Sequence, residues 1–180
     1  ALFGANSPQA AGGVAGGLAL GGPFTLVDTQ GRTVTDRSFR GRWMLMYFGY
    51  TSCPDVCPTE LQTVASALDR LGPAAARIAP VFITIDPARD TPTVLSHYTK
   101  LFDSRLIGLT GSAAEVDAAA RAYRVYHAKV TPPPRESYLV NHSSFLYLMD
   151  PNGRFRALYP PGLSAEALAT EIKRQMTTNS

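Results

Sequence analysis

An uninterrupted apolar segment, WMLMYF at residues 43–48, restricts the folds open to this chain more than any other feature. A strand with no polar residue on either side must be covered on both faces, which is typical of the inner strands of a sheet between helices. A second such segment, VFITI, occupies residues 81–85. Between them, apolar residues at helical spacing predict a helix over residues 58–71 that ends at a Gly-Pro pair. The chain therefore alternates buried strands with helices.

The other segments continue this alternation. Capping signals support the helices, most clearly at Ser112 and Glu115, whose spacing is that of a capping box. The predicted class is α/β, with a mixed central sheet flanked by helices and an added N-terminal hairpin. The further elements expected are a hairpin at 27–34, a helix at 91–102, a strand at 105–110, a helix at 112–123, a hairpin at 144–159 and a helix at 164–176.

Length and composition favour one folded domain. A chain of 180 residues is long enough for one hydrophobic core and short for two. Residues 1–21 are rich in glycine and alanine and carry no charge, which is typical of a flexible tail, so the domain is expected over residues 22–178. Seventeen basic and fourteen acidic side chains give a net charge of +3 without a basic block, so no nucleic-acid partner is expected.

The only two cysteines, Cys53 and Cys57, follow the first apolar strand and open the first helix. Four helical positions span about 6 Å, a separation that suits a disulfide and lets two sulfurs meet on one soft metal ion. A loop this short gains little from a structural cross-link. Prolines at positions 54 and 58 favour an exposed loop, and the helix N-terminus favours thiolate there. We expect redox cycling, metal binding or both; the alternative is two buried cysteines packed as small apolar residues.

An imidazole is a suitable third ligand for copper held by two thiolates, and the chain has three histidines. His97 lies on the polar side of a predicted helix, and His127 lies near a loop, so both are expected at the surface. His142 follows a proline-bearing loop and precedes a strong strand. The pattern alone favours a structural or exposed role for His142 over ligation.

Two aspartates near the cysteine motif have alternative roles. Asp55, inside the cysteine loop, is expected either to affect thiol acidity or partner docking, or to be a solvated loop charge. Asp86 follows the second apolar strand and is expected either to form an Asx-type turn or to accept a hydrogen bond behind the cysteine site. The turn is the favoured role for Asp86.

The chain carries three motifs in order, FGYTSCPDVCP at 48–58, VFITIDPARDTP at 81–92 and VNHS at 140–143. Together they resemble the Sco/SenC family, the copper chaperones of cytochrome c oxidase assembly, and the resemblance runs from about residue 22 to the end of the chain. It implies a thioredoxin-like fold and a single copper-binding domain over residues 22–178.

The ligand set that the resemblance implies is Cys53, Cys57 and His142, with copper bound as copper(I), copper(II) or both. Asn141 stands where the family commonly has aspartate before the histidine, so a different copper(II) affinity is expected. Ser52 replaces a larger side chain often found beside the first cysteine, which should leave the site more open.

The resemblance also implies partners. The expected function is delivery of copper to the dinuclear copper site of cytochrome c oxidase subunit II, with a periplasmic copper donor chaperone as a second partner. The alternative is a thiol–disulfide reductase that keeps the oxidase cysteines reduced and does not need His142. A peroxidase-like role, suggested by Thr51, is a third possibility.

Copper and reactive thiols suit an extracytoplasmic compartment. We expect the periplasmic side of the bacterial inner membrane, with the mitochondrial intermembrane space as the alternative. The resemblance implies a tether by one N-terminal membrane helix, as is typical of the family. Such a tether is expected in the full-length protein although these residues do not include one, and a soluble member is the alternative. No apolar run here approaches the roughly 18 residues that a membrane helix needs.

Overall fold

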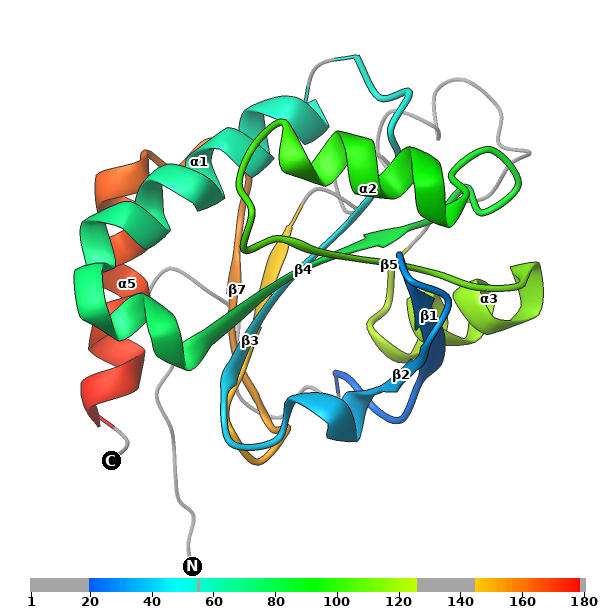
Figure 1. Cartoon of the computed structure of the whole chain (residues 1–180). Coiled ribbons are helices and arrows are strands. Elements are labelled where there is room, and N and C mark those ends of the chain that lie inside the picture. Colours follow the sequence, from blue (N-terminus) through cyan, green and yellow to red (C-terminus); the bar gives the residue numbers. More distant parts are fainter. Residues whose placement is uncertain (1–19, 55, 126–144, 179–180) are drawn as a thin grey trace, which may run out of the picture.

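A computed structural model describes residues 20–54, 56–125 and 145–178 (Figure 1). Its strands form one mixed sheet in the order β2-β1-β5-β4-β3-β6-β7. The strands are β1 (Thr25–Asp28), β2 (Thr33–Thr35), β3 (Trp43–Gly49), β4 (Ile78–Thr84), β5 (Ile107–Thr110), β6 (Leu146–Met149) and β7 (Phe155–Tyr159). The helices are α1 (Val56–Leu71), α2 (Pro92–Lys100), α3 (Ala113–Ala122) and α5 (Ala165–Thr178), with short 3-10 helices η1 (Asp36–Phe39) and η2 (Gly72–Arg77).

The two apolar segments form the centre of the sheet, as predicted. β3 and β4 run parallel over their whole length, and every residue of both strands is buried. β4 begins at Ile78 rather than at the predicted Val81, and Pro80 lies within it, opposite Leu45. β5 continues the parallel pairing beside β4, whereas β6 lies antiparallel to β3. The sheet is therefore mixed, with its parallel strands inside.

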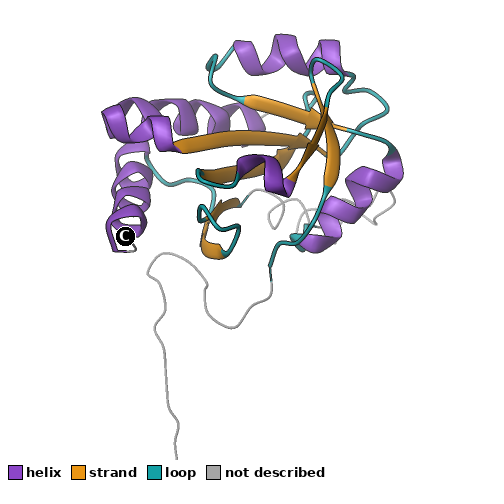
Figure 2. Cartoon of the chain, turned by 60° about the horizontal axis from the view of Figure 1, so that its bottom comes forward, coloured by secondary structure: helices purple, strands orange, loops and turns teal. Residues whose placement is uncertain are grey.

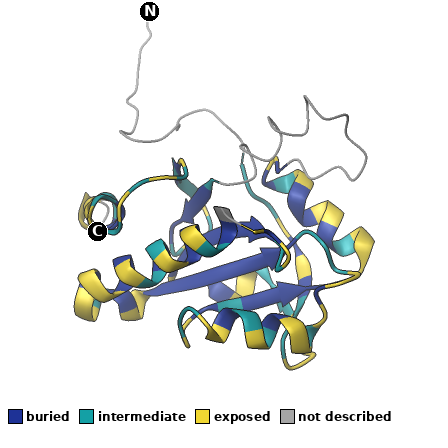
Figure 3. Ribbon diagram, turned by 90° about the horizontal axis from the view of Figure 1, so that it is seen from above, coloured by how far each residue is buried: buried dark blue, intermediate teal, exposed yellow. Residues whose placement is uncertain are grey.

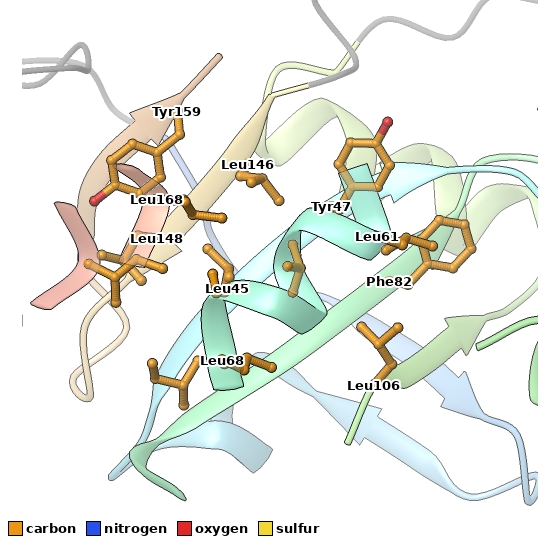
Figure 4. Packing of buried hydrophobic residues seen from close by; sticks show 14 of the residues in the cluster. Leu45, Tyr47, Leu61, Leu68, Phe82, Leu106, Leu146, Leu148, Tyr159 and Leu168 are labelled. Atoms are coloured by element: carbon orange, nitrogen blue, oxygen red, sulfur yellow. The ribbon is translucent and has the colours of Figure 1, made fainter. Parts of the chain in front are cut away.

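Alternation along β3 divides the interior into two cores, one on each face of the sheet. Trp43, Leu45 and Tyr47 join the cluster that includes buried residues of α1 and α5, and Met44 and Met46 join the cluster beneath α3. Figure 2 shows helices on both sides of the strands, and Figure 3 shows their outer faces exposed around a buried sheet. In Figure 4 the labelled side chains of the first cluster, from α1, α5, the sheet and the residue before β5, pack against one another.

Local signals set the helix boundaries. The Thr91 hydroxyl accepts a hydrogen bond from the backbone of Val94 at the start of α2. Ser112 and Glu115 form the predicted capping box at the start of α3, with both hydrogen bonds at 3.0 Å. The Asp150 carboxylate accepts two backbone N–H groups in the turn between β6 and β7. These contacts confirm the predicted element boundaries to within a few residues.

The observed architecture confirms the predicted fold class. The N-terminal hairpin, β1 and β2, is present and joins the sheet through β5. Residues 1–19 lie outside the described part, so the flexible tail stays a prediction; Gly21 donates its N–H to the carbonyl oxygen of Ala122. Among the residues that the structure describes, no helix is long and apolar enough to cross a membrane.

Candidate functional site

The two cysteines lie where β3 gives way to α1, in the cyan loop at the top of Figure 1. Cys53 closes a turn by donating its N–H to the carbonyl oxygen of Tyr50 at 3.1 Å. Cys57 lies in the first turn of α1, and its N–H donates to Cys53 Sγ at 3.4 Å. Both thiols are free. The predicted placement of the pair at a helix N-terminus is therefore confirmed, with α1 beginning at Val56 rather than at Pro58.

The prediction of an exposed cysteine loop is wrong for the cysteines themselves. Cys53 is 8% and Cys57 is 3% exposed, and both belong to the hydrophobic cluster shared with α1 and α5. The reason is that α1 packs its apolar side on the sheet, and this brings the Cys57 side chain inward. Ser52 and Pro54 beside Cys53 are exposed, so the loop reaches the surface through these neighbours.

Burial also changes the expected acidity. The pKa of the Cys57 thiol is raised because burial disfavours the charged form, and the hydrogen bond with Cys53 raises it further. The Tyr47 hydroxyl donates to Cys57 Sγ at 3.6 Å, which opposes this effect by stabilising thiolate. The prediction that the helix N-terminus would favour thiolate is therefore wrong for Cys57 in the metal-free protein.

Tyrosines and a glycine shape the space around the Cys57 sulfur. A Cβ atom on Gly49, the last residue of β3, would lie 2.8 Å from Cys57 Sγ. Burial, followed by the nearby thiols, raises the pKa of Tyr98, whose buried hydroxyl has no hydrogen-bond partner within the described ranges. The alternation of β3 signals the inward position of Tyr47, but the sequence holds no sign that it would reach a sulfur.

An aspartate that the sequence reasoning did not select holds the cysteine loop from behind. Asp90 is fully buried, and its carboxylate accepts hydrogen bonds from the N–H of Thr51 at 3.0 Å and from its hydroxyl at 2.6 Å. The same carboxylate accepts the Thr84 hydroxyl at 2.7 Å. The sequence feature that could have indicated Asp90 is its place in the second motif, immediately before the N-cap residue Thr91.

The structure places Asp86 in a turn, but the predicted Asx-type turn is wrong, because a backbone oxygen and not the carboxylate is the acceptor. The Asp86 carbonyl oxygen accepts the N–H groups of Arg89 and Asp90, so the turn exists, although the carboxylate does not form it. That carboxylate lies 3.6 Å from Arg89 Nε, and Arg89 also reaches the Ser52 hydroxyl at 3.5 Å. Arg89 therefore places a positive charge at the exposed edge of the cysteine loop.

Other predicted site residues have separate outcomes. His97 is exposed on α2, as predicted. Asp55, His127 and His142 lie outside the described residues, so their roles stay predictions. Within the described residues, no three metal-ligating side chains of His, Cys, Asp or Glu lie together. The described part of the site thus supplies two sulfur ligands, a set that suits soft metal ions and thiol–disulfide exchange.

Comparisons with known proteins agree with this arrangement. A family model described as SCO1/SenC matches residues 13–177. SenC of Rhodobacter capsulatus is 44% identical over 153 residues, which cover 85% of this chain and 69% of the relative. The mitochondrial SCO1 homolog 1 of Arabidopsis thaliana is 41% identical over 163 residues, which cover 90% of this chain but 48% of the relative. The chain thus spans about half the length of that relative.

A solved structure shows the same fold. The crystal structure of Arabidopsis thaliana ScoI with copper bound has a TM-score of 0.79 and 40% sequence identity to this chain, covering 89% of it and 99% of the ScoI chain. This likeness confirms the predicted thioredoxin-like arrangement. Family model, relatives and fold agree, and the chain belongs to the SCO1/SenC family.

Proposed function

We propose that this chain binds copper through Cys53, Cys57 and His142 and delivers it to the dinuclear copper site of cytochrome c oxidase subunit II. The observation that supports this most is that two free thiols lie next to each other at the N-terminus of α1, where the Cys57 N–H donates to Cys53 Sγ. Thiolates are soft ligands that select copper(I). Membership of the SCO1/SenC family and the copper-bound ScoI structure support copper as the cargo.

Binding is coupled to deprotonation. Each cysteine must lose its proton to ligate copper, so loading through both sulfurs releases two protons. Burial opposes the free Cys57 thiolate, whereas a bound cation offsets the charge that burial disfavours. The Tyr47 hydroxyl then remains a donor to the ligating sulfur. The site therefore disfavours a free Cys57 thiolate and accepts its charge once copper is bound.

Delivery follows from ligand exchange. Two sulfurs and one imidazole leave copper(I) open on one side, where a thiolate of the oxidase subunit can enter. Cys53 lies beside exposed Ser52 and Pro54, whereas Cys57 lies deeper, within the first turn of α1. The partner thiolate therefore approaches from the Cys53 side, and copper moves across without release into solution.

The test is an anaerobic copper(I) titration of the reduced protein against a chelator, followed by thiolate-to-copper absorption. Cys53→Ser, Cys57→Ser and His142→Ala should each lose most of the copper affinity. His97→Ala is the matched control, because His97 is exposed on α2, and it should bind copper as the unaltered protein does. Unchanged copper binding by His142→Ala would refute the ligand set.

A second candidate function is thiol–disulfide reduction, which keeps the oxidase cysteines ready for copper. The free, adjacent thiols support it, because one sulfur can attack a partner disulfide and the other can resolve the mixed disulfide. This reaction needs Cys53 and Cys57 but not His142. Copper-free His142→Ala should reduce a partner disulfide at the original rate if the chain is a reductase, and a rate lost with His142 would contradict it.

The site of action belongs to the same proposal. Delivery to the oxidase places the protein on the periplasmic side of the bacterial inner membrane, with the mitochondrial intermembrane space as the alternative. The relatives support both, because one is a bacterial SenC and another is a mitochondrial homolog. A periplasmic chaperone that loads the chain with copper remains part of this proposal.

A further inference from the structure

Asp90 is a buried carboxylate whose partners join the cysteine loop to the central sheet. It is 0% exposed. Its Oδ1 accepts the Thr51 hydroxyl at 2.6 Å, and its Oδ2 accepts the Thr51 N–H at 3.0 Å and the Thr84 hydroxyl at 2.7 Å. A buried carboxyl group is costly unless it is hydrogen-bonded, so the three donors from Thr51 and Thr84 satisfy Asp90 and tie their two segments to it.

The hydrogen bonds between Asp90 and Thr51 act on the turn that ends at Cys53. Thr51 lies inside the turn that the Cys53 N–H closes on the Tyr50 carbonyl, so two of the three hydrogen bonds fix the middle of that turn. Thr84 is the last residue of β4, and it lies opposite Gly49 at the end of β3. Asp90 thus lies between the turn and the end of β4, and its own N–H donates to the Asp86 carbonyl oxygen at 2.9 Å, so its backbone is held without the Thr84 hydroxyl.

Cys57 is fixed by other means. It lies within α1 and its sulfur contacts the Tyr47 hydroxyl, neither of which involves Asp90. The placement of Cys53 relative to Cys57 therefore depends on the Tyr50–Cys53 turn, and the turn depends on Asp90. A carboxylate 37 residues after Cys53 in the sequence is thus hydrogen-bonded to the turn that ends at Cys53.

We propose that Asp90 is a positioning residue for the cysteine pair, holding Cys53 Sγ where it can share a disulfide or a copper ion with Cys57 Sγ. The inference rests on the proposed function for the copper part only, because the disulfide equilibrium exists without copper. Loosening the turn lowers the effective concentration of one thiol near the other, so it weakens the disulfide.

The chain offers a matched pair of variants. Thr51→Val and Thr84→Val each remove one hydroxyl that donates to Asp90, at 2.6 and 2.7 Å, and each keeps the side-chain volume. The Thr51 hydroxyl belongs to the cysteine turn, whereas the Thr84 hydroxyl belongs to β4 and also accepts the Asp86 N–H. Both variants should lose stability, but only Thr51→Val should change the sulfur chemistry.

The experiment equilibrates each copper-free protein with glutathione. In the reaction, two glutathione thiols are oxidised to one glutathione disulfide, the Cys53–Cys57 bond breaks, and the protein thiols take up two protons. For Thr51→Val we expect the equilibrium constant for forming the protein disulfide to fall about tenfold, which is about 30 mV for a two-electron couple. Thr84→Val should stay within about twofold of the original protein.

Denaturant unfolding of the reduced proteins separates positioning from stability. A similar loss of stability in both variants with a changed potential only in Thr51→Val supports the proposal. If the reduction potential of the Cys53–Cys57 disulfide is the same in the two variants, whether or not it differs from that of the original protein, the proposal is overturned. Asp90 would then only stabilise the fold. The original protein could fail to bind copper in the titration described above while Thr51→Val still shifts the disulfide potential. That result would refute the proposed function and leave this inference standing.

Discussion

The space beside Cys57 predicts that Gly49→Ala will damage the site. Gly49 does not have a left-handed backbone conformation, so the β3 backbone accepts alanine and only the new methyl group matters. That methyl group would lie 2.8 Å from Cys57 Sγ, 3.0 Å from Phe82 Cε1 and 3.1 Å from Tyr47 Cε2. Ordinary contact begins at 3.4 Å, so the sulfur and the methyl group must move apart by at least 0.6 Å.

The expected cost follows from the surroundings. Phe82 and Tyr47 are buried and stacked, with ring centroids 6.1 Å apart, so the strain cannot be relieved by one flexible side chain. Overpacking of this kind costs about 1–3 kcal/mol. A displaced Cys57 sulfur should also weaken copper(I) binding by about tenfold, corresponding to about 1.4 kcal/mol.

Gly108→Ala is the matched control. Gly108 is a buried glycine of β5, and a Cβ there would meet its nearest atoms at 3.4 Å, within ordinary contact. Guanidinium unfolding of the copper-free proteins and copper(I) competition titration measure the two effects. Equal unfolding free energies and equal copper affinities in the two variants would refute the steric argument.

Two further predictions concern buried ionisable groups. Tyr47→Phe removes the hydroxyl that stabilises the Cys57 thiolate, so the pKa of Cys57 should rise further. In a Cys53→Ser background, alkylation of Cys57 should then slow at any pH below that pKa, and an unchanged rate would contradict the hydrogen bond. Burial raises the pKa of Glu60, so its stabilising contribution is present below the unfolded pKa of about 4.3 and is lost as pH rises through the folded pKa. As pH rises above about 4, the free energy of unfolding of the original protein should therefore fall relative to that of Glu60→Gln in urea titrations, and a pH-independent difference would count against burial as the cause.

Local patterns predicted most of the fold because their causes lie within a few residues. The capping box at Ser112 and the turn at Asp150 each depend on hydrogen bonds over two to four positions. The start of β4 was placed late because Pro80 has no N–H for a ladder and interrupts the apolar pattern, although β3 pairs with it along the whole strand. Tertiary pairing overrode the local signal there.

At the cysteine site, too, some features follow from local sequence and others only from tertiary packing. Its place at the β3–α1 junction follows from the sequence order of strand, loop and helix. Its burial does not, because the polar and proline-containing loop has the composition of an exposed segment while α1 draws Cys57 into the core. The second motif marked a region of interest, but the sequence pointed to Asp86, and only the fold shows that Asp90 contacts the loop.

Local sequence patterns thus suffice to predict an alternating α/β chain, a cysteine pair at a helix N-terminus and a family whose motifs include the pair. The groups that surround the sulfurs follow only from the packed fold. Thr51 and Asp90 are 39 positions apart, and Tyr47 and Cys57 are ten apart on different elements, so their contacts exist only once the sheet and α1 have packed. Local patterns encode elements, whereas the environment of a reactive group arises from long-range packing, and that environment determines when these thiols are charged and how firmly they are held together.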